Sequence, residues 1–100
     1  MGYSLEIFPE AELAINETVK KLEQGKAGRG SDLLVSISDA FEFIMKYPKG
    51  SEVRYRSFRA KPILGFPYLL IYEIIEPENS EIKIIAIEDF VHQSSNWLPS

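Results

Sequence analysis

The residue types best suited to chemistry lie together in one short basic segment. It interleaves cations with aromatic rings and reads Arg54-Tyr55-Arg56-Ser57-Phe58-Arg59-Ala60-Lys61. Residues 46–61 carry six Lys or Arg side chains against one acidic side chain, a local charge of +5 in a chain whose net charge is −4. Such a segment can stack on bases and bind phosphates, pair with an acidic partner protein, or form a solvated strand edge. Because the protein is acidic overall, we favour the protein partner.

Other candidate side chains lie in the second half of the chain. His92 is the only histidine and could act as a general acid or base, but a local hydrogen bond at the end of a strand is the favoured interpretation. Tyr68 and Tyr72 share one strand face, so we expect them to line the core or a groove. Glu73 and Glu88 could form a catalytic carboxylate pair, but the sequence does not place them near each other, and we favour surface or edge positions for them. With no cysteine and one histidine, neither a metal site nor a cofactor is expected.

The elements that position these residues are organised around the stretch from Phe66 to His92. Two short apolar runs, 69–75 and 82–87, are rich in β-branched and aromatic residues and predict two strands. The turn residues Pro77-Glu78-Asn79-Ser80 between them predict a hairpin loop. Both runs are apolar on both faces, so helices must cover at least one face.

The first half of the chain supplies those helices. Alternation over residues 3–7 predicts a half-buried strand, and Pro9 then begins a helix whose apolar stripe runs to Leu22 and stops at Gly25. The glycine-rich segment 25–30 matches no phosphate-binding pattern and predicts a plain loop. Ser31 is the expected N-cap of a second helix with a wide apolar face, ending near Tyr47.

One more extended segment, residues 53–63, completes the pattern. Strict alternation along it would place Arg54, Arg56 and Phe58 on one face and Tyr55, Ser57, Arg59 and Lys61 on the other. The element order is β-α-α-β-β-β in a single domain over residues 1–100. We therefore predict an α+β fold in which a helical hairpin packs on one face of a four-stranded, mainly antiparallel sheet.

The composition indicates where in the cell the protein is expected. No apolar run approaches the length of a membrane span, and residues 1–8 lack the regions of a signal peptide. The absence of cysteine suits a reducing compartment. We therefore expect a cytoplasmic protein with no membrane association.

With these elements in place, the chain resembles the RelE/ParE superfamily of bacterial toxins from type II toxin–antitoxin systems. It looks closest to the ParE-like, plasmid-stabilisation branch. The resemblance rests on Phe66-Pro67-Tyr68-Leu69-Leu70-Ile71-Tyr72-Glu73-Ile74, on the Ile-rich strand after it, and on His92 followed by Trp97. It implies a toxin neutralised by a cognate antitoxin, whose disordered segment folds across the helices and sheet in a hetero-oligomer.

The resemblance implies two different toxic activities. ParE-like toxins are associated with inhibition of DNA gyrase, whereas RelE-like toxins are endonucleases that cleave mRNA on the ribosome. In this chain Leu69 stands where the nuclease branch has a basic residue, and neither Arg nor Tyr follows His92. We therefore expect a toxin that acts by binding, with gyrase as the implied target and no confident catalytic residue.

Two alternatives remain beside that expectation. In the first, the protein is a ribosome-dependent mRNA endonuclease that uses Arg59, Lys61 and His92. In the second, it is a non-toxic binding module on the toxin fold. For binding of antitoxin or target, the expected residues are Arg54, Arg56, Phe58, Arg59, Lys61, Tyr68, Tyr72, His92 and Trp97.

Overall fold

The computed structural model describes residues 2–78 and 81–99 and has two helices and five strands in that part of the chain. In chain order the elements are β1 (Tyr3–Ile7), α1 (Pro9–Gly25), α2 (Arg29–Lys46), β2 (Glu52–Tyr55), β3 (Phe58–Pro62), β4 (Tyr68–Ile75) and β5 (Lys83–His92). The predicted mixed α+β class is therefore confirmed. The predicted hairpin loop over residues 77–80 lies partly outside the described residues.

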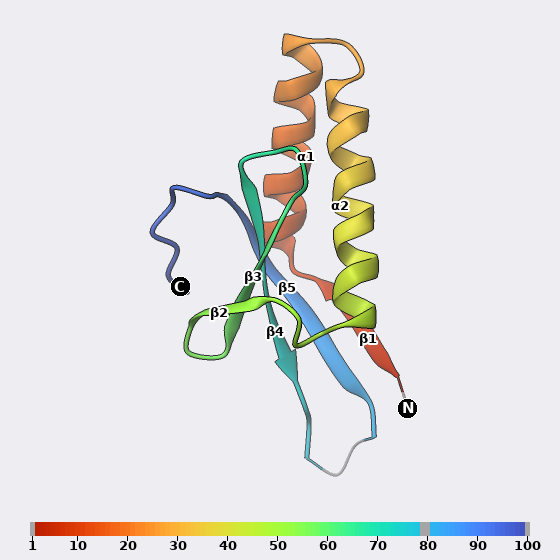
Figure 1. Cartoon of the computed structure of the whole chain (residues 1–100), viewed down its shortest axis with the longest axis vertical. Coiled ribbons are helices and arrows are strands. Elements are labelled where there is room, and N and C mark those ends of the chain that lie inside the picture. Colours follow the sequence, from red (N-terminus) through yellow and green to blue (C-terminus); the bar gives the residue numbers. More distant parts are fainter. Residues whose placement is uncertain (1, 79–80, 100) are drawn as a thin grey trace.

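The five strands form one open sheet in the order β1-β5-β4-β3-β2. β1 pairs in parallel with β5, and the other three pairs are antiparallel, so the sheet is mainly antiparallel as predicted. Both helices and β2, β3 and β4 separate β1 from β5 in the chain, a connection long enough for the two strands to run in parallel. Figure 1 shows the helical hairpin on one side of the sheet and the C-terminal segment on the other.

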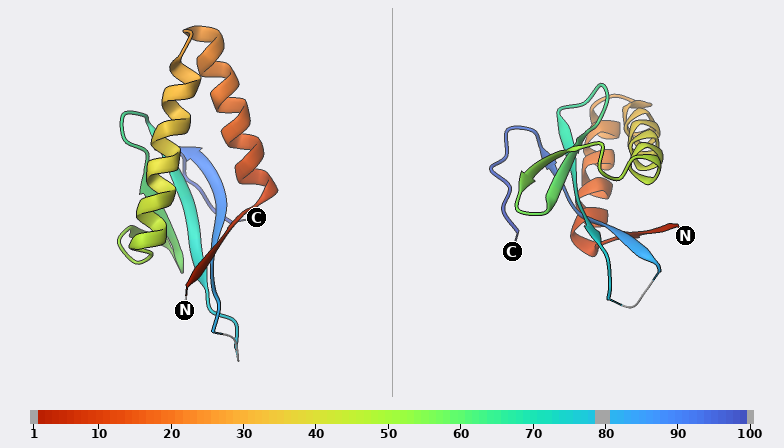
Figure 2. Two further views of the ribbon diagram at one scale, coloured as in Figure 1. Left: turned by 90° about the vertical axis from the view of Figure 1, so that its right-hand side faces the viewer. Right: turned by 60° about the horizontal axis from the view of Figure 1, so that its bottom comes forward.

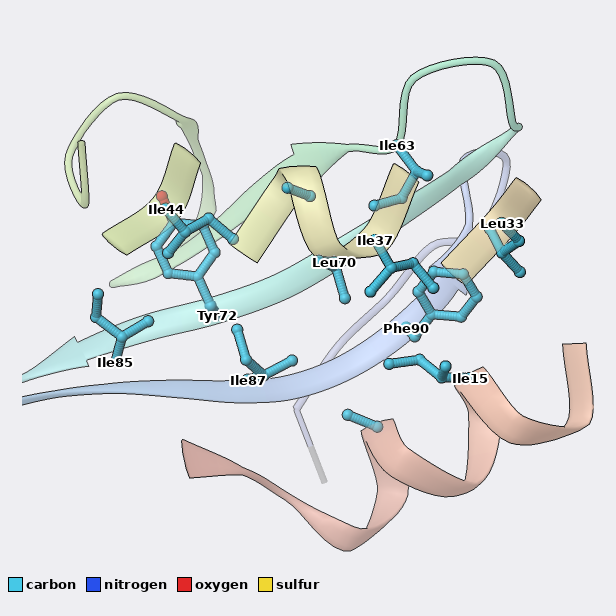
Figure 3. Close-up of a cluster of buried hydrophobic side chains, with 12 residues drawn as sticks. Ile15, Leu33, Ile37, Ile44, Ile63, Leu70, Tyr72, Ile85, Ile87 and Phe90 are labelled. Carbon is cyan, nitrogen blue, oxygen red and sulfur yellow. The ribbon is translucent and has the colours of Figure 1, made fainter. Parts of the chain in front are cut away.

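The main core lies between the helical hairpin and the sheet. Alternate residues of the central strands point toward one apolar stripe from each helix, as the period-two and 3.6-residue patterns predict. Figure 2 shows the two helices meeting at their connecting loop and diverging over the sheet. Figure 3 shows the side chains that fill the space between these layers. The buried members of this core are Ala11, Ile15, Leu33, Ile37, Ala40, Ile44, Ile63, Leu70, Tyr72, Ile85, Ile87 and Phe90.

The prediction of one strand over residues 53–63 was wrong, because the chain turns back at Arg56 and Ser57. β2 and β3 form a tight hairpin in which Tyr55 pairs with Phe58, and Arg56 has a left-handed φ of 51°. Such positions usually carry Gly or Asn, so an arginine there gives no turn signal in the sequence. The sheet therefore has five strands instead of the predicted four.

The connection between the helices is also shorter than predicted, since α2 begins at Arg29 and not after Ser31. Gly28 precedes it with a φ of 89°. The carboxylate of Glu23 accepts hydrogen bonds from the backbone N–H groups of Gly28 at 2.9 Å and Gly30 at 3.0 Å. These bonds satisfy the free N–H groups of the new helix, and the bond from Gly28 is the main reason that the pKa of Glu23 is lowered.

Neither helix within the described residues combines the length and the apolar character needed to cross a bilayer. One apolar stripe of each helix packs against the sheet instead.

Candidate functional site

Arg59 lies on the face of the sheet that the helices cover. It pairs in register with Tyr72 of β4, and its Nη1 donates hydrogen bonds to the carbonyl oxygens of Ser51 at 2.7 Å and Lys49 at 3.4 Å. The hydroxyl of Tyr72 donates to the carbonyl oxygen of Pro48 at 2.7 Å, and the Tyr72 side chain is fully buried. Both residues therefore anchor the connection between α2 and β2.

Lys61 lies two residues further along the same face of β3. It pairs with Leu70, a core residue, and its ammonium lies 4.2 Å from the centre of the Phe43 ring on α2. A cation over an aromatic face is an attractive contact that helps to hold the helix on the sheet. The two cations that the endonuclease alternative assigns to phosphate are thus engaged in packing around α2.

His92 ends β5 and is exposed. Its Nδ1 accepts the backbone N–H of Ser94 at 3.1 Å and lies 2.8 Å from the Ser94 hydroxyl oxygen. Its ring lies edge-on to Tyr68, with 5.8 Å between the ring centres, and Tyr68 in turn stacks on the core residue Phe90 at 5.1 Å. The local hydrogen bond expected for this histidine is therefore present, and Tyr68 packs against the core as expected.

The opposite face of the sheet carries a groove of about 290 Å³. Its floor is apolar and comes from β4 and β5, and its walls come from β2 and from residues 95–98 of the C-terminal segment. We call this the sheet-face groove. It is lined by Arg54, Tyr55, Leu69, Ile71, Val91, Ser95, Asn96, Trp97 and Leu98.

Trp97 fixes the C-terminal segment over this face. Its indole Nε1 donates a hydrogen bond to Asp89 Oδ2 at 2.8 Å, and its ring packs edge-on against Phe58 with 5.1 Å between the centres. Phe58 and Trp97 cover a second, smaller apolar cluster built from Ala60, Leu69 and Ile71. The guanidinium of Arg56 lies 5.1 Å from the centre of the Tyr55 ring at the tip of the hairpin.

The carboxylates of Glu73 and Glu88 meet on this same face of the sheet, a contact that the sequence pattern does not place. β5 has a bulge here, because Ile87 pairs with Tyr72 while Asp89 pairs with Ile71, so that Glu88 is the extra residue. The bulge turns the Glu88 side chain toward Glu73. No alternation pattern in the sequence reveals an inserted residue, so the pair could not be predicted.

The charge state of Glu88 reflects these neighbours. Its pKa is raised to about 7, first by burial, then by the negative charge of Glu73 and a side-chain hydrogen bond to it, and less by Glu10 and Asp89. The Ser57 hydroxyl donates a hydrogen bond to Glu73 Oε2 at 3.0 Å, so Glu73 lies between the β2–β3 turn and Glu88. Glu88 therefore changes its charge near neutral pH.

A second groove, of about 480 Å³, lies between the diverging helices and the end of β1. We call it the hairpin groove. Two of its apolar residues are exposed to solvent: Leu34 is 47% exposed and Ile7 is 40% exposed. The wide apolar face predicted for α2 was the sequence signal for this surface, because it exceeds what contact with one sheet requires. The groove is lined by Ile7, Glu12, Ile15, Asn16, Leu34, Ile37, Ser38 and Phe41.

The nine predicted binding residues thus divide among three places. Arg54, Arg56, Phe58 and Trp97 gather at the sheet-face groove and its rim. Arg59, Lys61 and Tyr72 are turned toward the helices, whereas Tyr68 and His92 form a ring pair at the end of β4 and β5. Within residues 2–78 and 81–99, no cluster of three or more His, Cys, Asp or Glu side chains is arranged to hold a metal ion.

Comparison with known proteins adds no family to this description: no protein-family model matches the chain, and no curated protein matches it.

Proposed function

We propose that this protein is the toxin of a type II toxin–antitoxin system, of the ParE-like, plasmid-stabilisation branch, and that it acts by binding and not by cleavage. The proposed target is DNA gyrase in the bacterial cytoplasm. A cognate antitoxin would neutralise the toxin by covering its surface in a hetero-oligomer. The proposal rests on the motifs that resemble the family. The chain also begins with a strand and two helices and continues with antiparallel strands, as the resemblance implies.

The observation that favours binding over RNA cleavage is that the Arg59 guanidinium is already hydrogen-bonded within the protein. Strand scission requires cations that are free to stabilise a phosphate and a base or acid within reach of it. Here the Arg59 guanidinium is held by two backbone carbonyl oxygens, and the Lys61 ammonium by an aromatic ring. His92 lies at the end of another strand and is bonded to its own turn. The endonuclease alternative therefore lacks a converging set of groups.

The hairpin groove supports the antitoxin part of the proposal. Its exposed Leu34 and Ile7 offer contacts for the apolar side of a partner helix. Glu12 and Glu10, the two acidic residues of the first turn of α1, favour basic side chains beside that apolar strip. A disordered segment that folds on contact would bury this surface. The free energy of apolar burial would offset the conformational entropy that the segment loses on ordering.

A supercoiling assay tests the proposed target. We expect the purified protein at micromolar concentration to block supercoiling by gyrase, and the product of the adjacent small reading frame to restore it. Unchanged supercoiling would remove gyrase as the target. Codon-phased cuts in mRNA after expression, lost in an Arg59→Gln, Lys61→Gln double variant, would instead favour the endonuclease.

A matched pair of variants tests the groove. Leu34→Arg places a charge in the hairpin groove, whereas Leu64→Arg places the same charge at a side chain that is 85% exposed and outside it. We expect the first variant to lose at least about tenfold in affinity for the co-expressed partner, and the second to bind as the unchanged protein does. Equal affinities for the two variants would place the partner elsewhere.

A further inference from the structure

We propose that Glu73 and Glu88 form a proton-operated latch that holds the C-terminal segment, residues 93–99, on the open face of the sheet. The proposal concerns how the sheet-face groove is covered and uncovered, and it does not depend on the toxin assignment.

The latch begins with the position of the two carboxylates. They come from the two central strands, and the bulge in β5 brings Glu88 against Glu73 and places Asp89 directly after it. Three carboxylates thus share one side of the sheet. Every neighbour that acts on Glu88 disfavours its ionised form, so a proton held between Glu88 and Glu73 removes one of three close negative charges.

The carboxylate cluster holds two peripheral segments of the chain. The hydroxyl of Ser57 in the β2–β3 turn donates to Glu73, and the indole of Trp97 in the C-terminal segment donates to Asp89. Asp89 Oδ1 also accepts the backbone N–H of Phe90 at 2.8 Å, which fixes its side chain at the bulge. A change in the geometry of the bulge is therefore transmitted to Trp97 through a single residue.

None of the groups that act on the pKa of Glu88 is cationic, although Arg54 of β2 lines the same face of the sheet. Glu10 at the start of α1 adds to the repulsion from the helix side, and residues 93–99 contain no titratable side chain. Arg56 belongs to the same turn as Ser57, but its guanidinium lies over the Tyr55 ring. Among the described residues, an ion pair is found at 3.9 Å between Lys83, the first residue of β5, and Glu76, which directly follows β4.

Loss of the shared proton therefore opens the latch. With Glu88 ionised, the carboxylates of Glu73, Glu88 and Asp89 repel one another across a bulge that already lacks one ladder pairing. The side chains separate, Asp89 turns, and the indole of Trp97 loses its acceptor. The C-terminal segment, which forms one wall of the groove and packs on its floor through Trp97, then leaves the sheet and exposes Leu69 and Ile71. Below the transition the face is covered, and above it the apolar floor is open to a partner.

The protein carries a reporter for this step, because Trp97 is its only tryptophan. We propose to measure quenching of Trp97 fluorescence by acrylamide in the full chain from about pH 5.5 to about pH 8.5, with far-UV circular dichroism to confirm that the fold is retained. We expect the quenching constant to rise about twofold or more across a transition near neutral pH, as the indole becomes solvated.

Variants separate the latch from other causes. Glu88→Gln cannot ionise but can still donate to Glu73, so we expect low quenching at every pH. Glu73→Gln removes the charge that opposes ionisation of Glu88, so the transition should move to lower pH. Glu17→Gln, an exposed change on α1, should leave it unchanged. His92→Gln tests the histidine that directly precedes the segment.

Three results would overturn the proposal. The first is quenching that does not change with pH in the unchanged protein. The second is a transition that persists in Glu88→Gln or disappears in His92→Gln. If Glu88→Gln does not fold, the decision rests on Glu73→Gln, and an unmoved midpoint in that variant rejects the latch.

Discussion

Tyr72 combines two roles at the level of a single side chain. Its ring is a fully buried part of the main core, and its hydroxyl donates to the carbonyl oxygen of Pro48. We expect Tyr72→Phe to lower the free energy of unfolding by about 0.5–1.5 kcal/mol, because the partly buried carbonyl of Pro48 loses its donor while the ring packing is kept. Chemical denaturation measures this value. Tyr47→Phe, at a 52% exposed side chain, is the control and should be close to neutral.

The raised pKa of Glu88 makes a second prediction, on stability. Its folded pKa of about 7 lies above the usual 4.5, so between these pH values the folded state binds more protons than the unfolded state. The free energy of unfolding from this group therefore falls as the pH rises from 4.5 to about 7 and is constant above that. Denaturant midpoints across this range should show a smaller decline in Glu88→Gln than in the unchanged protein. An identical pH profile in the two proteins would contradict the assignment.

Residue types and their order were enough to predict some of these side chains but not others. The local hydrogen bond of His92 and the core position of Tyr68 followed from their places in apolar strands. The Glu73–Glu88 pair did not, because it depends on one inserted residue in β5. The alternation of polar and apolar residues does not reveal the insertion of Glu88, because both Glu88 and Asp89 are polar.

At the scale of elements, the close approach of the two helices depends on one glycine. A Cβ at Gly30 would lie 2.8 Å from the carbonyl oxygen of Val19, a backbone atom that cannot move independently. We expect Gly30→Ala to destabilise the protein by about 1–3 kcal/mol, because the helices must separate near their connection. Thermal and chemical denaturation measure the effect.

The control for that prediction is a second glycine in the hairpin. A Cβ at Gly25 would meet nothing within 4 Å, and the residue is the last of α1. Gly25→Ala should therefore be neutral or stabilise by up to about 1 kcal/mol, since alanine loses less conformational freedom in a helix. If the two substitutions have equal effects, close packing at Gly30 is not what limits the approach of the helices.

Some helices and strands can be predicted from local sequence patterns, and others cannot. β1, both helices, β4 and β5 follow from hydrophobic periodicity and from the breaks at Pro and Gly. The β2–β3 hairpin does not, since its turn is made by Arg56 in a left-handed conformation. The start of α2 was also misplaced, because its cap is the distant carboxylate of Glu23 and not the local Ser31.

For the whole molecule, the fold separates two open surfaces. The hairpin groove lies between the helices and the end of β1, and the sheet-face groove lies on the opposite side of the sheet. A partner of the first surface does not have to displace any part of this chain. A partner of the second must compete with Trp97, so its affinity includes the cost of releasing the C-terminal segment.

The sheet order predicts how stability is distributed over the molecule. β4 and β5 lie at or next to the centre, pair on both sides and contribute most of the fully buried strand residues, whereas β2 is a short edge strand with mainly exposed side chains. Local opening requires less energy where few apolar contacts are lost. We therefore expect amide hydrogen exchange to be slowest in β4 and fastest, among the strands, in β2.

NMR or mass spectrometry would measure this order, because the amides of each strand can be assigned separately from their sequences. The parallel pair of β1 and β5 is the sensitive part of the prediction. β1 is an edge strand too, but Tyr3 and Leu5 pack against the main core and all five of its residues pair with β5. β1 should therefore exchange more slowly than β2 although both are edges. If β2 were protected as strongly as β4, the hairpin would have to be anchored by more than Arg59 and the Phe58–Trp97 contact, and the open face would not be the easily exposed side of this protein.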